Sequence, residues 1–572
     1  MAIEESFSKS LFYGAIPEEM IFPFPESTAA ERDHAALLLE RVRDLGRHSI
    51  DPARIDRDGL IPPEALDALR RAGVFGINIP QNLGGSGLSL TGQARVIQEL
   101  AAFDASVAVT VMAHGLRAAN AVMLFGTDAQ RARWLPAMAR GERIGAFALS
   151  EAGAGSDAGG IRTQATLKPG GLWTLDGAKS WVTNGGVADL AVVIARTTER
   201  AQHARPRLTA FMLERGDGFT VSGDPAKLGV RGASTPSMQL PGISVTSDRV
   251  LGEVGRGFKV AMEVLSRGRV GLAAGCVGAA RRLARMSIER ASARSAFGRS
   301  IAEFGLIKDK LARMMTETWA MESMVYLTAG IADAKVPDWS LESAMCKVFA
   351  TEALWRIASE ALQIAGGAGV SQAEPFERML RDARVYLLME GTNETLRAYI
   401  ALAGLQGPSR QIAEVARSMR EPIKGFGLMY EFAIQRARSA LGRERTTRGH
   451  AALRREVTML EEHVGALARG VDKVLRRHGK DIAEMQYTQR RLADIATDLF
   501  ALSSCVARCT RAIERKGESG ARRELDLTAA FANMADRRLR ANIAAFDAND
   551  DELLKGIAVQ ACADGAYSFE VL

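Results

Sequence analysis

The chain has 572 residues and a formal net charge of +7; 47% of its residues are hydrophobic and 25% are charged. These fractions are ordinary for a globular protein and exclude the collagen-like and intrinsically disordered classes. The length predicts about three to four domain-sized units, and no uninterrupted run of about 18 apolar residues indicates a membrane-spanning helix.

The cysteine count and the first residues indicate the compartment. Five cysteines, few and odd in number, favour free thiols in a reducing cytoplasm over a disulfide framework. Residues 1–6 lack the basic start and the apolar core of a signal peptide. We therefore expect a cytoplasmic protein. The seven histidines include no HExxH motif, so no metal site is expected.

Residues 1–146 are predicted to form a helical domain, because apolar residues recur there at helical spacing. The two prolines at 62 and 63 favour the start of a helix, since the fixed φ of proline suits a first turn. The glycine-rich residues 82–87 indicate a loop. The expected helices are residues 31–45, a helix that starts at 64, residues 91–103 and residues 129–139.

Residues 147–253 have a different character. Short runs with β-branched and aromatic residues are separated by Gly, Asp and Asn. This spacing predicts an antiparallel β domain rather than βαβ units. The expected strands are residues 172–175, 190–196, 208–213 and 219–221.

Helical periodicity returns in residues 254–405, and a linker is expected at Gly404 to Ser409. The four helices expected in this region are residues 257–291, 304–333, 338–366 and 386–403. In residues 451–572, apolar residues from Leu453 to Val474 and from Leu492 to Ile513 alternate at spacings of four and three, which is typical of a helical bundle. The fold class is therefore mainly α with a central β domain.

Cys505 and Cys509 lie four residues apart on the second of these apolar rows. Core packing is the favoured interpretation, because free cysteine behaves as a small apolar residue. A redox role is the alternative.

Positive charge is concentrated in residues 408–455, where eleven Lys or Arg and four Glu give +7, equal to the net charge of the whole chain. We assign residues 406–450 to a basic amphipathic linker. Apolar residues recur in it at helical spacing, which favours peripheral binding of residues 417–448 to an anionic membrane at its inner face. A solvated linker is the alternative.

Two motifs before residue 190 are candidates for ligand binding. Residues 151–160 form the densest glycine cluster, but Ala158 stands where the GxGxxG fingerprint requires its third glycine. The cluster indicates either a turn or a pyrophosphate site to which Ser156 adds a hydroxyl. Trp181 and Thr183 lie two apart, hence on one face of a strand, and suit a flat heteroaromatic ring. The alternative is a core tryptophan at a hairpin end.

A third motif, residues 389–394, places the carboxylate of Glu390 in an otherwise apolar stretch that Gly391 interrupts. A carboxylate in apolar surroundings is a stronger base than one in water, which suits a general base that works near neutral pH. A helix cap is the alternative.

Two further short motifs, RxxFG at residues 294–298 and QxxGG at residues 363–367, complete a set of five. Taken together, the five motifs resemble the acyl-CoA dehydrogenase family. They occur in the family's order and spacing, and the resemblance runs from about residue 30 to residue 405. The N-terminal Phe22-Pro-Phe-Pro and residues 398–406 are similar to the very-long-chain branch, which also carries a C-terminal helical extension. Ala152 departs from the family, which usually has Pro there. The five motifs are GAGSD (153–157), WVTNGG (181–186), RxxFG (294–298), QxxGG (363–367) and EGTNE (390–394).

The resemblance implies a fold of helical, β and four-helix-bundle domains with an extra C-terminal helical domain. It also implies an FAD enzyme of fatty acid β-oxidation that converts medium-to-very-long-chain acyl-CoA to trans-2-enoyl-CoA and passes electrons to an electron-transferring flavoprotein. Glu390 matches the family's catalytic base, and its backbone N–H would bind the thioester oxygen as charge develops there. One branch carries its base on an earlier helix, where this chain has Gly268, so the base is expected to be Glu390.

The other functional positions follow from the same resemblance. Within one subunit the expected FAD contacts are Phe147, Leu149, Ser150, Ser156, Trp181, Thr183, Thr392 and Glu394. Toward the FAD of a neighbouring subunit they are Arg294, Phe297, Gln363, Gly366 and Gly367, so a homodimer is expected. The expected substrate contacts are Ser156, Ser266, Arg269, Glu390, Gly391 and, at the closed end of the acyl pocket, Met112.

A second hypothesis is a flavin-binding, non-catalytic protein of the same fold, either DNA-associated or an assembly factor for respiratory complexes. The basic segment supports it. Retention of Glu390 argues against it, since a scaffold needs no buried base, and nucleic-acid binding is not expected.

Overall fold

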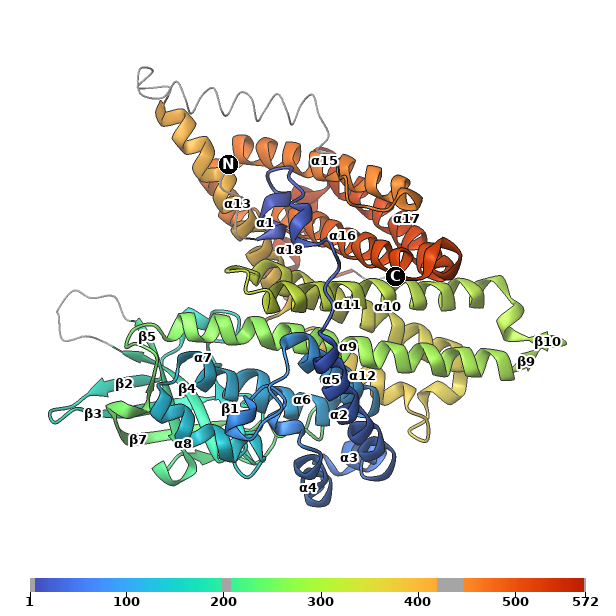
Figure 1. The fold of residues 1–572 in the computed structure, drawn as a ribbon. Helices are drawn as coiled ribbons and strands as arrows, with labels where there is room; N and C mark the ends of the chain where they lie inside the picture. The colour runs from blue at the N-terminus through green and yellow to red at the C-terminus, as the bar shows by residue number, and fades with distance from the viewer. Residues whose placement is uncertain (1–5, 198–206, 419–445, 570–572) are drawn as a thin grey trace.

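The computed structural model describes residues 6–197, 207–418 and 446–569. A mixed sheet lies beside a layer of N-terminal helices, long helices cross the middle of the molecule, and C-terminal helices cover the far side (Figure 1). The mainly α fold with a central β domain is confirmed.

The N-terminal helices begin at the residues that the sequence favours. The predicted helices are confirmed as α2, α4, α5 and α8, and Thr28, Ser89 and Thr127 each accept a backbone N–H at a helix start, as N-caps do. The helices are α2 (Ala29–His48), α3 (Pro52–Asp58), α4 (Pro63–Ala72), α5 (Leu90–Phe103), α6 (Ala105–Met112), α7 (Asn120–Phe125) and α8 (Asp128–Ala139). A π-helix, η4 (Ala113–Ala119), joins α6 to α7.

One described helical stretch, Ala105–Phe125, is long and apolar enough to cross a membrane. In the fold 89% of its apolar window is buried, and α6, η4 and α7 pack against α9. The stretch is therefore a core element here, although polar residues keep it from being an uninterrupted apolar run.

The β domain contains the four predicted strands, now β3 (Leu172–Lys179), β4 (Leu190–Thr197), β5 (Arg207–Glu214) and β6 (Thr220–Val221). The predicted antiparallel domain needs one correction: β4 pairs in parallel with β1 and β2, which makes the sheet mixed. The remaining strands are β1 (Gly145–Ala148), β2 (Gln164–Leu167), β7 (Met238–Thr246) and β8 (Val250–Leu251). The strand order is β6-β7-β3-β2-β4-β5-β8, with β1 on β4.

The long helices α9 (Gly257–Ala293), α10 (Gly305–Asp333) and α11 (Ser340–Ala365) confirm three of the four predicted helices of this region. A hairpin, β9 (Ser295–Ala296) and β10 (Arg299–Ser300), joins α9 to α10 and projects from the end of the bundle (Figure 1).

The fourth predicted helix, 386–403, is wrong as a continuous element. α12 (Phe376–Tyr386) ends before it, and α13 (Asn393–Ser418) begins inside it. Glu390 and Gly391 have positive φ angles of 59° and 95°, which an α-helix cannot contain.

The linker predicted at 404–409, and with it the start of a linker at 406, is also wrong. α13 continues through Pro408 to Ser418. Leu405 is buried in the core, and a Cβ at Gly404 would collide with the ring of Phe12. Close packing of α1 (Phe7–Leu11) on α13 therefore outweighs the helix-breaking residues. Residues 419–445 lie outside the described part of the chain.

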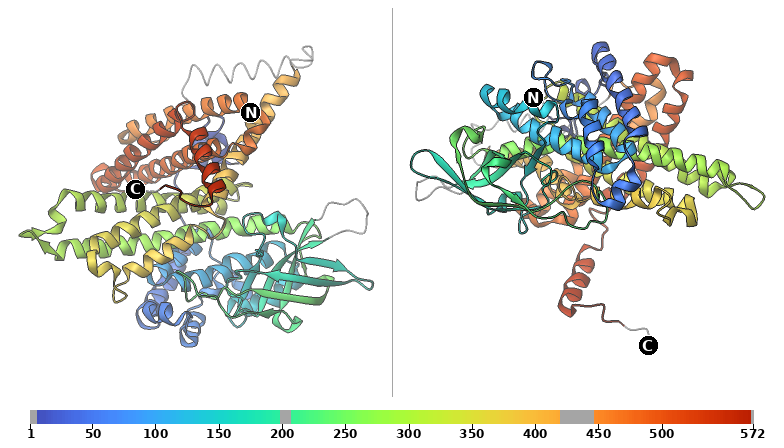
Figure 2. Two further views of the ribbon diagram at one scale, coloured as in Figure 1. Left: turned by 180° about the vertical axis from the view of Figure 1, so that it is seen from behind. Right: turned by 90° about the horizontal axis from the view of Figure 1, so that it is seen from below.

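The C-terminal helices are α15 (Arg454–His478), α16 (Gln486–Gly520), α17 (Arg522–Ala544) and α18 (Asp551–Asp564). Both predicted apolar rows are buried, Cys505 and Cys509 included. α16 packs on α10 and α13, and α17 packs on α10. Trp319 of α10 donates a hydrogen bond of 3.1 Å to Thr528, and Arg508 lies 3.9 Å over its ring. α18, by contrast, projects away from the rest of the chain (Figure 2).

Candidate active site

The turn between α12 and α13 presents Glu390 to the interior. Glu390 is 6% exposed, although its φ of 59° lies in the left-handed region that a residue with a Cβ rarely adopts. Such a conformation persists only where the surroundings determine it, and it is concentrated at functional sites. On the far side of the turn, the hydroxyl of Thr392 accepts the backbone N–H of Thr395 at 3.3 Å and starts α13.

Lys347 of α11 fixes this turn through three hydrogen bonds. Its buried ammonium donates to the carbonyl oxygens of Leu387 (3.1 Å) and Gly391 (2.8 Å) and to Oδ1 of Asn393 (2.7 Å). Three donors thus meet three acceptors. Burial lowers the pKa of Lys347 to about 7.

α9 forms the wall opposite the Glu390 carboxylate. A Cβ at Gly268 would lie 2.9 Å from one carboxylate oxygen, so glycine is the residue that leaves room for the acid there. The next residue, Arg269, is buried and donates from Nε to the backbone carbonyl of Glu390 at 3.2 Å. Ser266 is also buried on this helix and donates to its own helix at Met262.

Arg117 is a residue of this site that the sequence prediction missed. It lies on the π-helix η4 and forms an ion pair with Glu390. Among the described residues, neither oxygen of Glu390 accepts a hydrogen bond of normal geometry. Burial lowers the pKa of Arg117 to about 10, so it is a cation at neutral pH. The available signal was its position as the lone charge in the apolar stretch 105–125.

Met112 lies beside the same part of α9. It is 1% exposed, and a Cβ at Gly271 would lie 3.2 Å from its Cγ and Sδ atoms. Gly268 and Gly271 are three residues apart and share a helix face. Met112 and the Glu390 carboxylate therefore contact α9 about one turn apart.

The glycine cluster forms a loop that is held from behind. Glu151 accepts the N–H groups of Arg162 (2.6 Å) and Thr163 (3.0 Å) and an ion pair from the buried Lys179 at 2.7 Å. Lys179 also donates to the carbonyl of Leu149. The opposite side of the loop is open: Ser156 is exposed, and nothing lies within 4 Å of a Cβ built on Gly153 or Gly155.

Trp181 stands next to this loop, because Ser180 donates a hydrogen bond to Ser150 at 2.9 Å. Trp181 has a φ of 57° and is 63% exposed. Thr183 is buried, and Asn184 fixes the turn by donating to the carbonyls of Thr110 and Gly145. The core-tryptophan interpretation of Trp181 is therefore wrong. The expected strand is wrong as well, because β3 ends at Lys179 and Trp181 and Thr183 lie in the bend and turn that follow.

The remaining predicted FAD residues divide into two groups. Near the β domain and the Glu390 turn, Phe147 is buried, Leu149, Ser150 and Thr392 are half-buried, and Glu394 is exposed. At the far end of α9, about 40 Å along the helix from Gly268, Phe297 is 94% exposed at the tip of the β9–β10 hairpin. The other predicted residues of this group, Arg294, Gln363, Gly366 and Gly367, are exposed too, and Arg290 near the end of α9 donates to the carbonyl of Ala365 beside them.

The geometry of the near group fits a flavin dinucleotide. The exposed indole of Trp181 offers a plane for a heteroaromatic ring, and the uncovered glycine backbone with Ser156 offers donors for a pyrophosphate. Glu390 provides a buried carboxylate, which forms an ion pair with Arg117. The far group cannot reach the same ligand from the same chain.

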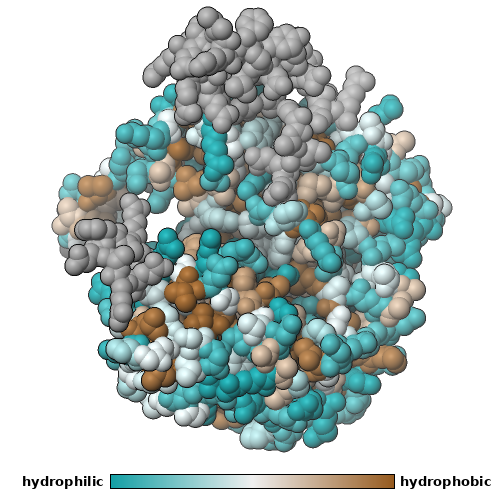
Figure 3. All heavy atoms as spheres, turned by 60° about the vertical axis from the view of Figure 1, so that its left-hand side comes forward, coloured by the Kyte–Doolittle hydropathy of each residue, from teal (hydrophilic) through white to brown (hydrophobic). Residues whose placement is uncertain are grey.

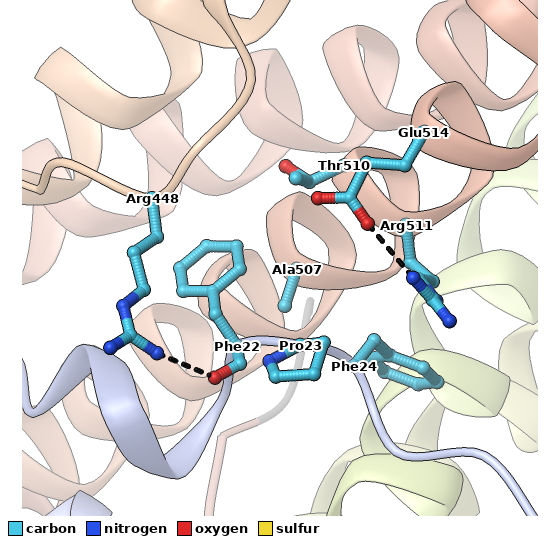
Figure 4. A pocket seen from close by; sticks show the side chains of 8 residues that line it. All are labelled: Phe22, Pro23, Phe24, Arg448, Ala507, Thr510, Arg511 and Glu514. Carbon is cyan, nitrogen blue, oxygen red and sulfur yellow. Dashed lines mark hydrogen bonds and ion pairs between the residues drawn. The ribbon is translucent and has the colours of Figure 1, made fainter.

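A cavity of about 280 Å³ lies away from Glu390 and the glycine loop. Figure 4 shows the side chains of Phe22, Pro23 and Phe24 along it, with Arg448 and Arg511 on its two sides. None of its lining residues is a predicted site residue. It belongs to the contact between the N-terminal segment and α16.

A mainly helical chain with a central sheet, an open glycine loop beside an exposed indole, and a buried carboxylate indicates a flavin-dependent dehydrogenase. Family models match along the chain: acyl-CoA dehydrogenase N-terminal domain at residues 32–142, middle domain at 146–243 and C-terminal domain at 255–405. The protein belongs to the acyl-CoA dehydrogenase family. Residues 451–567 match the ACAD9/ACADV C-terminal domain, which confirms the resemblance to the extended branch.

Individual relatives agree with these models. The chain is 35% identical over 560 residues to the mitochondrial very long-chain specific acyl-CoA dehydrogenase of Homo sapiens, covering 96% of this chain and 85% of that protein. An acyl-CoA dehydrogenase from Bacillus anthracis in complex with FAD is 26% identical, with a TM-score of 0.78 over 94% of this chain and 91% of that one. A structure described as an electron-transferring flavoprotein of Acidaminococcus fermentans is 31% identical, with a TM-score of 0.62 over 67% and 99%.

Proposed function

We propose that this protein catalyses the FAD-dependent α,β-dehydrogenation of medium-to-very-long-chain acyl-CoA in fatty acid β-oxidation, with Glu390 as the base. The observation that carries the proposal is the placement of Glu390. Its carboxylate is buried in a turn with positive φ and faces Gly268, where a side chain would occupy the space of the acid. A purely structural protein has no need of such a carboxylate.

In this reaction Glu390 takes the proton from the α-carbon of the thioester. Trp181, Thr183 and the glycine loop would hold FAD, which would supply the hydride acceptor for the β-hydrogen as the Cα–Cβ single bond becomes a double bond. Burial of Glu390 excludes water from the proton transfer. Arg269 holds the carbonyl of Glu390, and Lys347 holds the carbonyls on both sides of it, so the carboxylate stays in place.

The test is the oxidation of palmitoyl-CoA by the purified flavoprotein, followed with an artificial electron acceptor. Octanoyl-CoA serves as the shorter comparison. We expect turnover with both and formation of the trans-2-enoyl product. A protein that retains flavin but oxidises neither substrate would contradict the proposal and favour a non-catalytic role.

The electron acceptor in this proposal is an electron-transferring flavoprotein. The resemblance to the acyl-CoA dehydrogenase family implies this acceptor, and a structure with the same fold is described as an electron-transferring flavoprotein. Reduction of a purified electron-transferring flavoprotein by the enzyme and palmitoyl-CoA would test it. No transfer to that protein, with normal transfer to the artificial acceptor, would contradict it.

We also propose a homodimer. The exposed residues at the far end of α9, among them Phe297, lie about 40 Å from the Glu390 side of the same chain, so a second copy could complete the FAD site. α18 exposes Leu553, Leu554 and Ile557. The C-terminal helices cover part of α10 and α13, which leaves less surface for a tetramer. Light scattering at the mass of two chains is expected, and the mass of four would contradict the proposal.

Peripheral membrane contact through residues 417–448 stays a prediction, because most of that segment lies outside the described residues. The cytoplasmic location also stays a prediction. Apolar surface also occurs on the β-domain side of the molecule, between polar patches (Figure 3). Charge reversal within 417–448 should weaken binding to anionic vesicles by about 1 kcal/mol per base and leave activity in solution unchanged. Equal vesicle binding of the variant would assign the segment to a plain linker.

A further inference from the structure

The stretch Ala105–Phe125 contains one charged side chain, Arg117, and the fold leaves only 11% of that side chain exposed. Its charged partner among the described residues is Glu390, and its Nε atom has no hydrogen-bond partner there. A buried arginine without a carboxylate is costly, and so is a buried carboxylate without a cation. The two charges therefore compensate each other in an otherwise apolar place.

We propose that Arg117 is a positioning residue for the base: it holds Glu390 ionised and aimed at α9 in the free enzyme, and it sets the pH range in which the base is ready to act. This inference rests on the proposed function, because it concerns the readiness of Glu390 for proton abstraction. It is independent of the FAD contacts, which involve other residues.

The location of Arg117 supports a functional role. It lies in a π-helix, a segment that occurs frequently at functional sites because its extra residue redirects side chains. η4 packs against both β1 and α9, so it lies between the cofactor side and the wall opposite Glu390. The same helical turn holds His114, whose two ring nitrogens contact Gly145 and Met138 and are therefore engaged elsewhere.

Other charged groups surround Glu390 but do not replace Arg117. On α9, Arg269 binds the backbone carbonyl of Glu390, and its guanidinium lies 5.9 Å from the ring of Tyr399 on α13. On α11, Lys347 binds backbone carbonyls and Asn393. Glu394 on α13 is exposed. Arg117 is the cation that meets the carboxylate itself.

The direction of the effect follows from charge. A nearby cation favours the ionised form of a carboxylate, by about 1–3 pH units within a few ångströms. Removing Arg117 should therefore move the acid limb of kcat/KM to higher pH.

The experiment compares Arg117→Met, Arg117→Lys and the matched control Arg285→Met in the flavin-loaded enzyme. Arg285 is exposed on α9, about 26 Å along the helix from Gly268, so its loss changes the net charge equally without touching the site. The profile of kcat/KM against pH reports groups of the free enzyme. We expect a shift of about 1–3 pH units for Arg117→Met, a smaller one for Arg117→Lys and none for Arg285→Met.

A second measurement does not depend on turnover. The infrared band of a protonated carboxyl group, assigned by its loss in Glu390→Gln, should appear at higher pH in Arg117→Met than in the unchanged protein. Identical acid limbs and identical infrared titrations would overturn the inference. An unchanged protein that titrates at Glu390 but has no dehydrogenase activity would instead contradict the proposed function.

Discussion

Two wholly buried lysines hold the two halves of the active site, and they do so differently. Lys179 holds the glycine loop through the carboxylate of Glu151 and the carbonyl of Leu149. Lys347 holds the Glu390 turn through two carbonyls and an amide oxygen, with no carboxylate among these partners. Burial lowers the pKa of both, to about 8 for Lys179 and to about 7 for Lys347.

The difference matches what each segment presents. The glycine loop is exposed on its ligand side, so an ion pair at its rear can be strong without disturbing the ligand. The Glu390 turn is buried, and a second carboxylate beside Lys347 would place a like charge next to the base. Neutral acceptors fix the turn without that repulsion. We therefore expect cofactor retention and proton abstraction to respond to different substitutions.

The largest effect is expected for Glu390→Gln, which should abolish most catalysis without affecting flavin binding. The amide keeps the shape of the side chain but cannot accept the α-proton, so kcat should fall by about 10²- to 10⁴-fold. Bound flavin, measured by absorbance after gel filtration, should stay at the unchanged level. Substantial turnover of palmitoyl-CoA by this variant would remove Glu390 from the role of base.

Lys179→Met is expected to have a smaller effect, which concerns the glycine loop: the variant should lose fold stability and bound flavin. It leaves the carboxylate of Glu151 without its cation, which should destabilise the fold by about 3 kcal/mol, at the low end of the range for broken buried pairs because Glu151 is partly exposed. The loop should loosen and release flavin. Urea unfolding and flavin content measure the two effects.

The control for that variant is the double substitution Lys179→Met with Glu151→Gln, which removes the stranded charge and should recover part of the stability. Burial alone would raise the pKa of Glu151, but hydrogen bonds from Lys179, Thr163 and Arg162 lower it to about 2. A lowered carboxylate pKa adds stability that is present above about pH 4.5 and is lost as the pH falls toward 2. The double variant should lack this acid dependence.

Lys347→Met should act on the turn and spare the flavin. Loss of three hydrogen bonds leaves buried acceptors unpaired, at a cost of about 1–3 kcal/mol, and kcat should fall more than flavin content does. The folded pKa of Lys347 lies below its unfolded value of 10.5, so the unfolded chain binds more protons between about pH 7 and 10.5. Stability relative to the variant should therefore rise with pH across that window. Flavin loss without a change in kcat per bound flavin would refute the assignment of Lys347 to the turn.

Much of the fold could be predicted because it depends on local patterns. The apolar rows 453–474 and 492–513 alone specify the faces of α15 and α16. The errors occur where tertiary contacts override local preference. Gly404 and Pro408 indicate a linker, but the ring of Phe12 packs so closely on Gly404 that the helix continues. Parallel pairing of β4 with β1 and β2 joins segments far apart in sequence, which no local pattern encodes.

The candidate site was predictable where a motif marks it and not where a single buried charge does. Glu390, Trp181 and Ser156 stand in glycine-containing motifs, and Glu390 and Trp181 have the positive φ angles of unusual turns. Arg117 and Lys347 carry no motif: Arg117 is the one charge in the apolar stretch 105–125, and Lys347 lies between Glu342 and Glu352 on α11. Such a charge is rarely buried without a partner, so its presence indicates a polar site, but the partner is known only once the helices are packed.

The smallest effect is expected for the preferred length of the acyl chain, which depends on Met112 near Glu390. Met112 packs on Gly271, about one helical turn along α9 from the glycine that faces Glu390. If it forms the floor of the acyl pocket, it limits how deep the chain can enter, and its flexible thioether can move aside at some cost. We therefore expect medium-to-long acyl chains to be preferred, with efficiency falling for the longest.

Met112→Gly should move that optimum to longer chains. Each methylene that becomes buried can gain up to about 0.8 kcal/mol, or about fourfold in kcat/KM. Glycine also costs about 1 kcal/mol of helix stability, so Met112→Ala is the second variant, with more space but little loss of helix. Both should retain flavin and should oxidise octanoyl-CoA at nearly the rate of the unchanged enzyme, because a short chain does not reach the floor. The measurement is the ratio of kcat/KM for palmitoyl-CoA to that for octanoyl-CoA. An unchanged ratio in both variants would show that Met112 only fills the core between α6 and α9, and the role of Glu390 would not depend on that result.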